Sequence, residues 1–269
     1  MVDILKRSLA PVTDAAWQEI DFQAKRSLKG NLSARGIVDF SGPHGWEYAA
    51  VNTGQLDYRT KKPVGGVAWG LREVLPLVEV RVPFKLDIMD LDCVARGSKA
   101  PELTPIHEAA RRVAIFEEQA IYYGFKDGQI QGIAEATPLK PLTLAKTPNT
   151  YQETIEVGII AMQKEGIEGP YELVLGDVPY KTLMSGDERG YPLVRRIKDI
   201  TAGDIRWSPV VKGGMLISKR GGDFEMTVGQ DLAVGYHSHT ATEVELYITE
   251  SFTFQVLEPL AAIEFKLKL

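Results

Sequence analysis

The sequence of 269 residues has a single cysteine, Cys93, so it cannot form an internal disulfide bond. The absence of disulfides is typical of a reducing compartment. No run of about 18 apolar residues occurs, so the sequence contains no candidate transmembrane helix. The first residues also lack the apolar stretch and small-residue cleavage site of a secretory signal peptide. We therefore expect a cytoplasmic protein that has no membrane partner.

Strong charge of one sign is absent as well. The chain has 31 basic and 36 acidic residues, which gives a net charge of −5 with histidine neutral. This mild acidity argues against a protein whose partner is a nucleic acid. Apolar residues make up 44% and charged residues 25%, which is ordinary for a folded chain that buries a full core.

The sequence has little that could carry catalysis or bind metal. It has four histidines but no cysteine pair and no His-Glu-x-x-His motif. Neither a G-x-S-x-G elbow nor a Walker-type phosphate loop occurs. His237 and His239 could face one side of a strand, but zinc needs three or four ligands, so we predict a solvated polar loop. The sequence thus predicts no metal, no cofactor and no catalytic residue.

Two further groups could be mistaken for functional sites. Gly221 and Gly222 precede Asp223 between two strand-like segments, and we interpret them as a turn and not as a phosphate cradle. Glu117 and Glu118 could form an acid–base pair, but no cleft is visible around them. We predict that both carboxylates lie on the solvated face of a helix.

The first helix is predicted from about Asp14 to Arg35, with Thr13 as its N-cap. Apolar residues recur there at helical spacing, and they are Trp17, Ile20, Ala24, Leu28 and Leu32. A second helix is predicted to begin at Thr104, because a proline follows in its first turn, and to end at Gly124.

A third helix is predicted from Thr150 to about Glu165. The segment Thr150–Glu153 matches a capping box, in which Thr150 would cap the helix. Gly158 lies inside this helix, where glycine is unfavourable by about 1 kcal/mol relative to alanine. We therefore predict that Gly158 allows a close contact between the helix and another element.

From Val51 to Lys85 the sequence predicts an extended arm. A glycine-rich loop tip at 60–66 separates two extended segments, and Val78, Val80, Val82 and Phe84 alternate with polar residues. Pro83 places the second segment at the edge of a sheet. A two-stranded arm is marginally stable alone, so we expect it to lean on another element or another subunit.

The last third of the chain is rich in strands. Residues 244–256 and 263–269 alternate apolar and polar side chains, which predicts two long half-buried strands. Tyr171–Leu175 predicts a further strand, and 180–199 predicts two short helices around a polar loop at 185–190. Helices and strands are intermixed without a βαβ series, so the predicted fold class is α+β.

Seven segments, in order along nearly the whole chain, resemble those of the encapsulins, the shell proteins of bacterial and archaeal nanocompartments that are also described as linocins. Each segment alone is a weak signal, but their order makes the resemblance specific. The segments are Leu5–Pro11, Trp17–Asp21, Gly42–Ala50, Gly166–Tyr171, Arg220–Phe224, Gly229–Leu232 and Ile248–Val256.

The resemblance implies the HK97-like fold of phage capsid proteins, with a peripheral domain, an axial domain and an extended E-loop. The helix from Thr104 would be the spine helix of the peripheral domain. The implied ranges are 1–50 for the N-terminal helix and the start of the peripheral domain, 51–85 for the E-loop, 86–135 for the peripheral domain with the spine helix, 136–220 for the axial domain, and 221–269 for the C-terminal strands of the peripheral domain.

The resemblance further implies an icosahedral shell that encloses a cargo enzyme. Cargo would carry a C-terminal targeting peptide that docks in an apolar groove between the N-terminal helix and strands of the peripheral domain. Ferritin-like iron-storage proteins or dye-decolourising peroxidases are the expected cargo. Matching motifs place the groove at Leu28, Leu32, Arg35, Asp39, Val234, Tyr236 and Ile248. Core packing of the apolar residues and a local Arg35–Asp39 ion pair are the alternative interpretation.

The same resemblance implies a pore at the fivefold axis. The loop that would line it comprises Asp187, Glu188, Arg189, Gly190 and Tyr191, and five copies would form a ring of charges whose signs partly cancel. Closed symmetry makes about 60 copies, a T=1 shell, the smallest icosahedral assembly. The alternatives are a major capsid protein of a phage or prophage, and a bacteriocin or protease.

Overall fold

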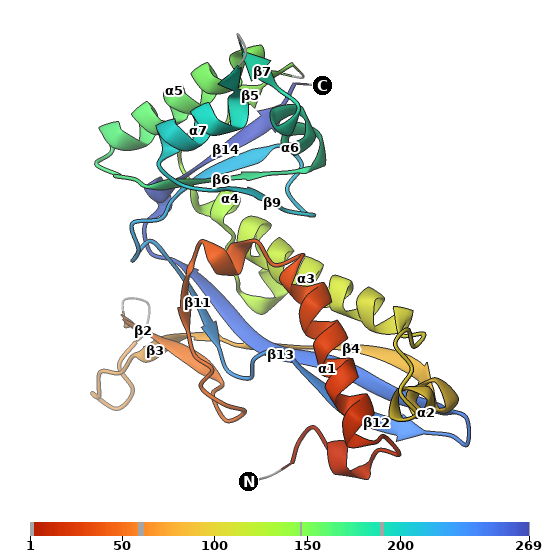
Figure 1. Ribbon diagram of the computed structural model, residues 1–269. Helices are drawn as coiled ribbons and strands as arrows, with labels where there is room; N and C mark the ends of the chain where they lie inside the picture. Colours follow the sequence, from red (N-terminus) through yellow and green to blue (C-terminus); the bar gives the residue numbers. More distant parts are fainter. Residues whose placement is uncertain (1–2, 59–61, 146, 189–190, 269) are drawn as a thin grey trace.

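The computed structural model describes residues 3–58, 62–145, 147–188 and 191–268. Two lobes follow one another along an elongated molecule, and a thin hairpin arm projects from the lower lobe (Figure 1). Each lobe is built on one five-stranded sheet, and the long helix α3 (Thr104–Tyr123) packs in the lower lobe. The mixed fold agrees with the predicted α+β class.

The lower lobe contains the sheet of the longest strand, β13, and we call it the β13 sheet. Strand β13 lies between β4 on one edge and both β11 and β12 on the other. Helices α1 and α3 pack together in this lobe, and α3 contacts β4 and β13. The elements are β1 (Asp39–Ser41), β4 (Val78–Asp87), β11 (Phe224–Val228), β12 (Ala233–His239), β13 (Glu243–Val256), α1 (Asp14–Lys29) and α2 (Ile88–Ala95).

The upper lobe is built on the second sheet, which we call the β10 sheet, with order β5-β14-β10-β6-β9. Helices α5, α6 and α7 lie in this lobe, and α4 connects it with the end of α3. The elements are α4 (Ile133–Ala136), β5 (Leu142–Leu144), α5 (Tyr151–Lys164), β6 (Tyr171–Leu175), α6 (Asp177–Met184), α7 (Leu193–Thr201), β9 (Ile205–Trp207), β10 (Gly214–Ser218) and β14 (Ala262–Leu267).

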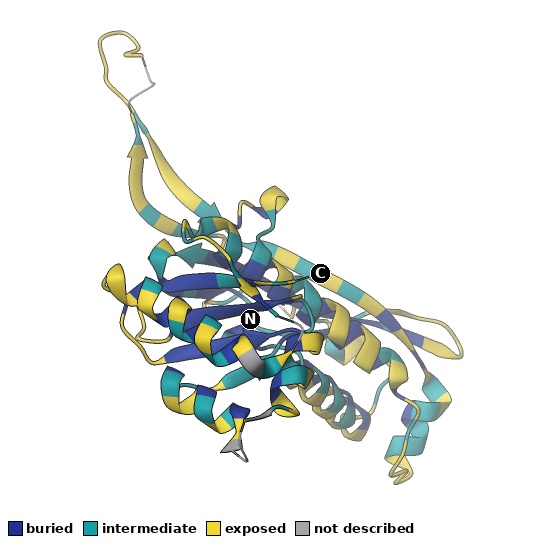
Figure 2. Ribbon diagram, turned by 90° about the horizontal axis from the view of Figure 1, so that it is seen from above, coloured by how far each residue is buried: buried dark blue, intermediate teal, exposed yellow. Residues whose placement is uncertain are grey.

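The projecting arm is the hairpin of β2 (Ala50–Asp57) and β3 (Leu71–Pro76), and Figure 2 shows it extending away from the buried body. It is shorter than the predicted arm of 51–85. Strand β4 belongs to the β13 sheet, where it pairs with β13 from Asp87 opposite Glu243 to Val78 opposite Phe252. Pro83 lies in this strand, whose pairing in the described chain is with β13 alone, so its prediction as an edge position is confirmed.

The C-terminal strand also differs from the expectation. Strand β14 was grouped with the C-terminal strands of the peripheral domain, but it lies in the other sheet, between β5 and β10. Strand β13 is buried on both faces from Tyr247 to Thr253, so the prediction of a half-buried strand is wrong there. Alternation cannot show burial when the polar positions carry threonine and serine whose hydroxyls bond inside the protein.

The helix predictions were mostly confirmed. Thr13 caps α1 by accepting a hydrogen bond from the amide of Ala16, but the helix ends at Lys29 and not near Arg35. Thr150 makes no side-chain capping bond to α5, so the predicted capping box is wrong. A Cβ on Gly158 would lie 3.2 Å from the ring of Phe265, which confirms the predicted close contact of α5 with the β10 sheet.

Candidate functional site

A pocket of about 540 Å³ lies between α1 and β12, and we call it the α1–β12 pocket. Apolar residues from both walls form most of its lining, with charged residues among them. The lining residues are Arg7, Asp21, Ala24, Lys25, Leu28, Lys29, Leu32, Arg35, Asp231, Leu232, Ala233, Val234 and Ile248.

The α1 wall follows from the helical period of the sequence. Ala24 and Leu28 are four residues apart and therefore lie on one face of the helix. Both are buried, whereas Leu32, just beyond the end of the helix, is half-buried and packs against the same core. A face of this kind presents apolar surface to the pocket without being filled by the core.

The opposite wall is set by strand pairing. Val234 in β12 lies opposite Ile248 in β13, and both side chains are buried against the core below α1. Their position on the inner face of the sheet follows from the two-residue period of a strand. The pocket therefore has a sheet as one wall and a helix as the other.

The N-terminal segment closes one end of the pocket. The amide of Tyr236 donates to the carbonyl of Leu5 at 2.8 Å, so this segment runs along the outer edge of β12. Arg7 forms an ion pair with Asp21 at 2.8 Å, and its guanidinium lies 4.0 Å from the ring centre of Trp17. These contacts hold Arg7 against α1.

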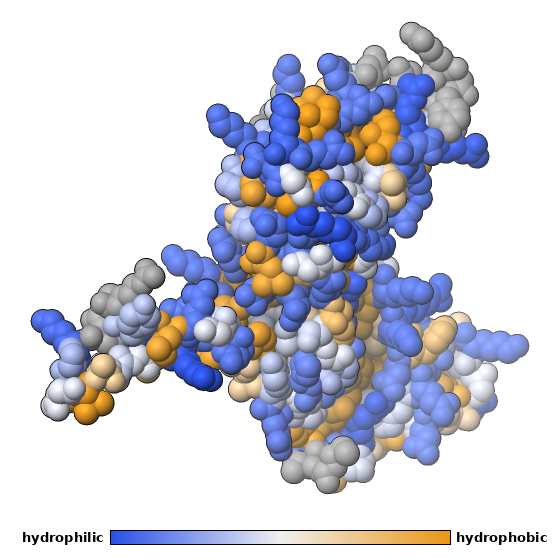
Figure 3. All heavy atoms as spheres, turned by 90° about the vertical axis from the view of Figure 1, so that its left-hand side faces the viewer, coloured by the Kyte–Doolittle hydropathy of each residue, from blue (hydrophilic) through white to orange (hydrophobic). Residues whose placement is uncertain are grey.

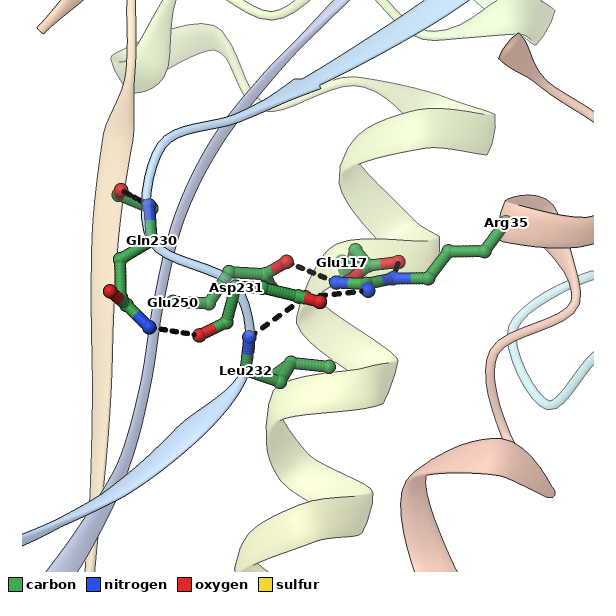
Figure 4. Close-up of polar contacts among 7 residues, drawn as sticks. Arg35, Glu117, Gln230, Asp231, Leu232 and Glu250 are labelled. Carbon is green, nitrogen blue, oxygen red and sulfur yellow. Dashed lines mark hydrogen bonds and ion pairs between the residues drawn. The ribbon is translucent and has the colours of Figure 1, made fainter. Parts of the chain in front are cut away.

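Arg35 closes the other end of the pocket, at the centre of a cluster of carboxylates (Figure 4). It donates to both oxygens of Glu117 and, at 2.8 Å, to Asp231, and it also donates to Glu250. The side chains of Glu117 and Glu250 are fully buried. Burial and then the nearby charge of Glu117 raise the pKa of Glu250 well above its usual value.

Glu118, the next residue on α3, forms a second buried cluster. Its carboxyl accepts hydrogen bonds from the Ser33 hydroxyl at 2.5 Å, the Ala34 amide at 2.7 Å and the Ser208 hydroxyl at 2.7 Å. Burial raises the pKa of Glu118 to about 7, against these hydrogen bonds, which lower it. The prediction that Glu117 and Glu118 lie on a solvated face is therefore wrong, because that side of α3 is covered by other elements.

Two of the predicted groove residues lie outside the pocket lining. Asp39 is exposed and accepts a hydrogen bond from the amide of Gly222 at 2.6 Å, so the alternative of a local Arg35–Asp39 ion pair is wrong. Tyr236 is half-buried, and its hydroxyl bonds to the Nδ1 of His239 at 2.6 Å. The other predicted residues, Leu28, Leu32, Arg35, Val234 and Ile248, line the pocket.

Sequence reasoning missed several lining residues: Arg7, Asp21, Ala24, Lys25, Lys29, Asp231, Leu232 and Ala233. A signal was available on α1, because residues 21, 25 and 29 repeat at a spacing of four beside the apolar stripe. For Arg7 no local signal existed, since its position depends on the path of the N-terminal segment along β12.

The predicted pore loop lies in the upper lobe. Strand β7 (Asp187–Glu188) pairs with β8 (Tyr191–Pro192) in a short hairpin between α6 and α7. Arg189 and Gly190 fall outside the described residues.

The candidate metal residues are not clustered. His237 and His239 are exposed, but they lie in strand β12, at an irregularity of its pairing, and not in a loop. Among the described residues, no group of three or more histidine, cysteine or carboxylate side chains could hold a metal ion. In the same part of the chain, no helix has the length and apolar character needed to cross a bilayer.

Two lobes, a long spine helix and a projecting hairpin define an HK97-like capsid protein, and solved structures agree. A virus-like particle from Pyrococcus furiosus matches with a TM-score of 0.62 at 16% identity, over 92% of this chain and 98% of that one. The capsid of Myoviridae phage XM1 matches with a TM-score of 0.53 at 12% identity, over 88% of this chain and 89% of that one. Identities this low show the fold alone.

Sequence comparison shows the family. The profile described as "encapsulating protein for peroxidase" matches residues 2–253. The type 1 encapsulin shell protein of Rhodospirillum rubrum is 40% identical over 96% of this chain and 95% of its own length. That of Mycobacterium tuberculosis is 39% identical over 93% and 94%. The chain belongs to the encapsulin shell protein family, and it is a structural, shell-forming protein and not an enzyme.

Proposed function

We propose that this shell protein retains its cargo by binding a short peptide of the cargo in the α1–β12 pocket. The observation that carries the proposal is the pocket itself, whose helix and sheet walls expose apolar surface at Leu32 beside the buried Leu28 and Val234. Apolar anchors in such a cavity would supply binding energy, and the charged ends at Arg7 and Arg35 would limit how the peptide lies.

The cargo in this proposal is a peroxidase or a ferritin-like iron-storage protein that carries the peptide at its C-terminus. The family description, which names a peroxidase as the encapsulated protein, supports the first. Ferritin-like cargo is proposed on the family resemblance alone. Several weak peptide contacts from one oligomeric cargo would add up through their high effective concentration.

The test compares two aspartate substitutions near the same helix. Leu32→Asp places a charge on the apolar wall of the pocket at a half-buried position. Phe22→Asp is the matched control, because Phe22 is 57% exposed on α1 and lies outside the pocket lining. Shells would be purified from the source organism, and their contents identified by mass spectrometry, haem absorbance and iron content.

We expect assembled shells from both variants, with cargo present in F22D and reduced at least about tenfold in L32D, because a charge in an apolar contact costs more than about 1.4 kcal/mol. Equal cargo in L32D and wild type would refute docking in this pocket. Shells that are empty in the wild type would refute cargo retention itself.

We also propose that the arm makes a contact between neighbouring copies. Large apolar side chains are exposed on it, including Leu56, Val64, Val67 and Leu71, and Figure 3 shows apolar atoms along the projecting arm. Burying this surface against a second copy would stabilise the shell at about 25 cal/mol for each Å². A closed shell of about 60 copies in the cytoplasm follows from the resemblance and from closed symmetry.

Particle mass tests the assembly proposal. For a chain of 29.8 kDa, about 60 copies correspond to about 1.8 MDa. A monomer or small oligomer in light scattering would overturn it, and a larger particle would replace the T=1 shell with a larger one.

The β7–β8 hairpin is proposed to line a pore at the fivefold axis. Its place between α6 and α7 supports a loop that reaches the end of the upper lobe. Reversing the charge with Asp187→Lys and Glu188→Lys is expected to slow cation entry into the shell, as measured by iron uptake of loaded particles. Unchanged uptake would remove this loop from the entry route.

A further inference from the structure

The charges around the α1–β12 pocket are unevenly balanced. Arg7 is paired with Asp21, and Arg35 is shared among Glu117, Glu250 and Asp231. These pairs account for the charged groups contributed by the N-terminal segment, the segment after α1, and the loop before β12.

Lys25 and Lys29 are different. Both line the pocket from α1 and are exposed, and within the described part of the chain neither ammonium group has an ion-pair partner. They are four residues apart, so their Cβ atoms lie about 6 Å from each other on one side of the helix. The apolar wall at Leu28 lies between them along the chain.

From this arrangement we infer that the peptide bound in the pocket is acidic as well as apolar, with aspartate or glutamate side chains placed against Lys25 and Lys29. The inference rests on the proposed docking function and adds the chemistry of its partner. Apolar anchors occupy the space between α1 and β12, and a carboxylate beside the anchors reaches the two lysines at the lip. The unpaired carboxylate density at the Asp231 end disfavours an acidic group there, so the charges also fix the direction of the peptide.

The electrostatic effect is moderate, because both lysines are exposed to solvent. Exposed ion pairs contribute little individually, so two such contacts are expected to favour an acidic peptide over its amide counterpart by about threefold to tenfold. They determine which peptide is preferred more than whether one binds.

A library of random ten-residue tails tests the inference. The tails are fused to the C-terminus of a small fluorescent reporter and co-expressed with the full-length shell protein, and tails captured in purified shells are sequenced. The shell variants are wild type, Lys25→Glu with Lys29→Glu, and Leu32→Asp. The control, Lys126→Glu with Lys164→Glu, has the same change in net charge at exposed positions outside the pocket.

In wild-type shells we expect captured tails to be enriched in leucine, isoleucine or valine, and in aspartate or glutamate by about threefold to tenfold over the input. In K25E/K29E the acidic enrichment should disappear and basic residues should replace it, while K126E/K164E should behave as the wild type.

Two negative outcomes are distinguishable. If apolar enrichment is present and lost in L32D, but acidic content equals the input, the docking function stands and the acidic partner is refuted. If captured tails show no apolar enrichment and do not differ between wild type and L32D, the docking proposal fails and this inference fails with it. Particle mass is measured for every variant, and only assembled shells are compared.

Discussion

Glu117 and Glu118 are neighbours on α3, and both are fully buried, but the protein stabilises them in different ways. Glu117 faces the guanidinium of Arg35, which it shares with Glu250 and Asp231. Glu118 accepts hydrogen bonds from neutral groups only, at Ser33, Ala34 and Ser208. A full opposite charge compensates for the lost hydration in the first case, whereas neutral donors compensate in part, and the pKa of Glu118 is raised to about 7.

The two clusters also connect different parts of the chain. The Arg35 cluster joins α3 to β13 and to the loop before β12, all within the lower lobe and at the end of the pocket. The Glu118 cluster joins α3 to the end of the first helical segment and, through Ser208, to the loop after β9 in the upper lobe. One cluster organises the pocket, and the other joins the two lobes.

Replacing the arginine should have the largest effect. Arg35→Ala leaves Glu117 and Glu250 buried without a counter-charge, and breaking a buried pair in this way costs about 3–5 kcal/mol. We expect failed assembly or a strongly lowered melting temperature, measured by scanning calorimetry at fixed protein concentration. Arg35→Lys should recover part of the loss, since lysine keeps the charge but not the paired hydrogen bonds. A melting temperature of R35A close to that of wild type would show that the cluster contributes little.

The pH dependence should separate Glu118 from Glu117. The pKa of Glu118 in the folded protein is about 7, above the value of 4.5 for a free side chain. Its contribution to stability is therefore complete below pH 4.5 and is lost as the pH rises through 7, by at most about 3 kcal/mol. Glu118→Gln should remove this dependence, so the variant should gain in melting temperature over wild type between pH 5 and 8.

The matched control for this comparison is Glu108→Gln, an exposed glutamate on the same helix. Its difference from wild type should not change across the same pH range. A parallel pH response of E118Q and wild type would contradict a protonated Glu118 in the folded protein.

Removing one neutral donor should have a smaller effect. Ser208→Ala deletes one of the hydroxyl groups bound to Glu118, and the loss of one hydrogen bond costs about 1 kcal/mol. Because that hydrogen bond lowers the pKa of Glu118, its loss should shift the pH dependence upward, as followed by melting temperature against pH. A shift toward lower pH would contradict the assigned role of Ser208.

The smallest effect is expected for Glu250→Gln. The raised pKa of Glu250 means that its carboxyl is already protonated near neutral pH, so a neutral amide of the same shape should change stability by less than about 1 kcal/mol. Glu117→Gln is the comparison, because it weakens the paired hydrogen bonds with Arg35 and should cost more. Equal losses in the two variants would show that Arg35 does not distinguish between them.

The prediction from sequence was accurate where the signal was local. The boundaries of α3, the helix of Gly158 and the strand Tyr171–Leu175 each follow from capping, glycine placement or periodicity within one segment. Apolar residues of the site, such as Leu28, were also identified. Sequence reasoning failed where distant segments meet, as with β14, which joins the β10 sheet by pairing with β5 and β10.

The sequence by itself determined an α+β shell protein, because ordered motifs along the chain and the periodic helices and strands are properties of neighbouring residues. Only the tertiary structure decided that Glu117 and Glu118 are buried, that Arg35 pairs with Glu117, Asp231 and Glu250 and not with Asp39, and that Arg7 reaches the pocket. Burial and charge pairing depend on which distant elements cover a side chain, and a helical or strand pattern does not contain that information.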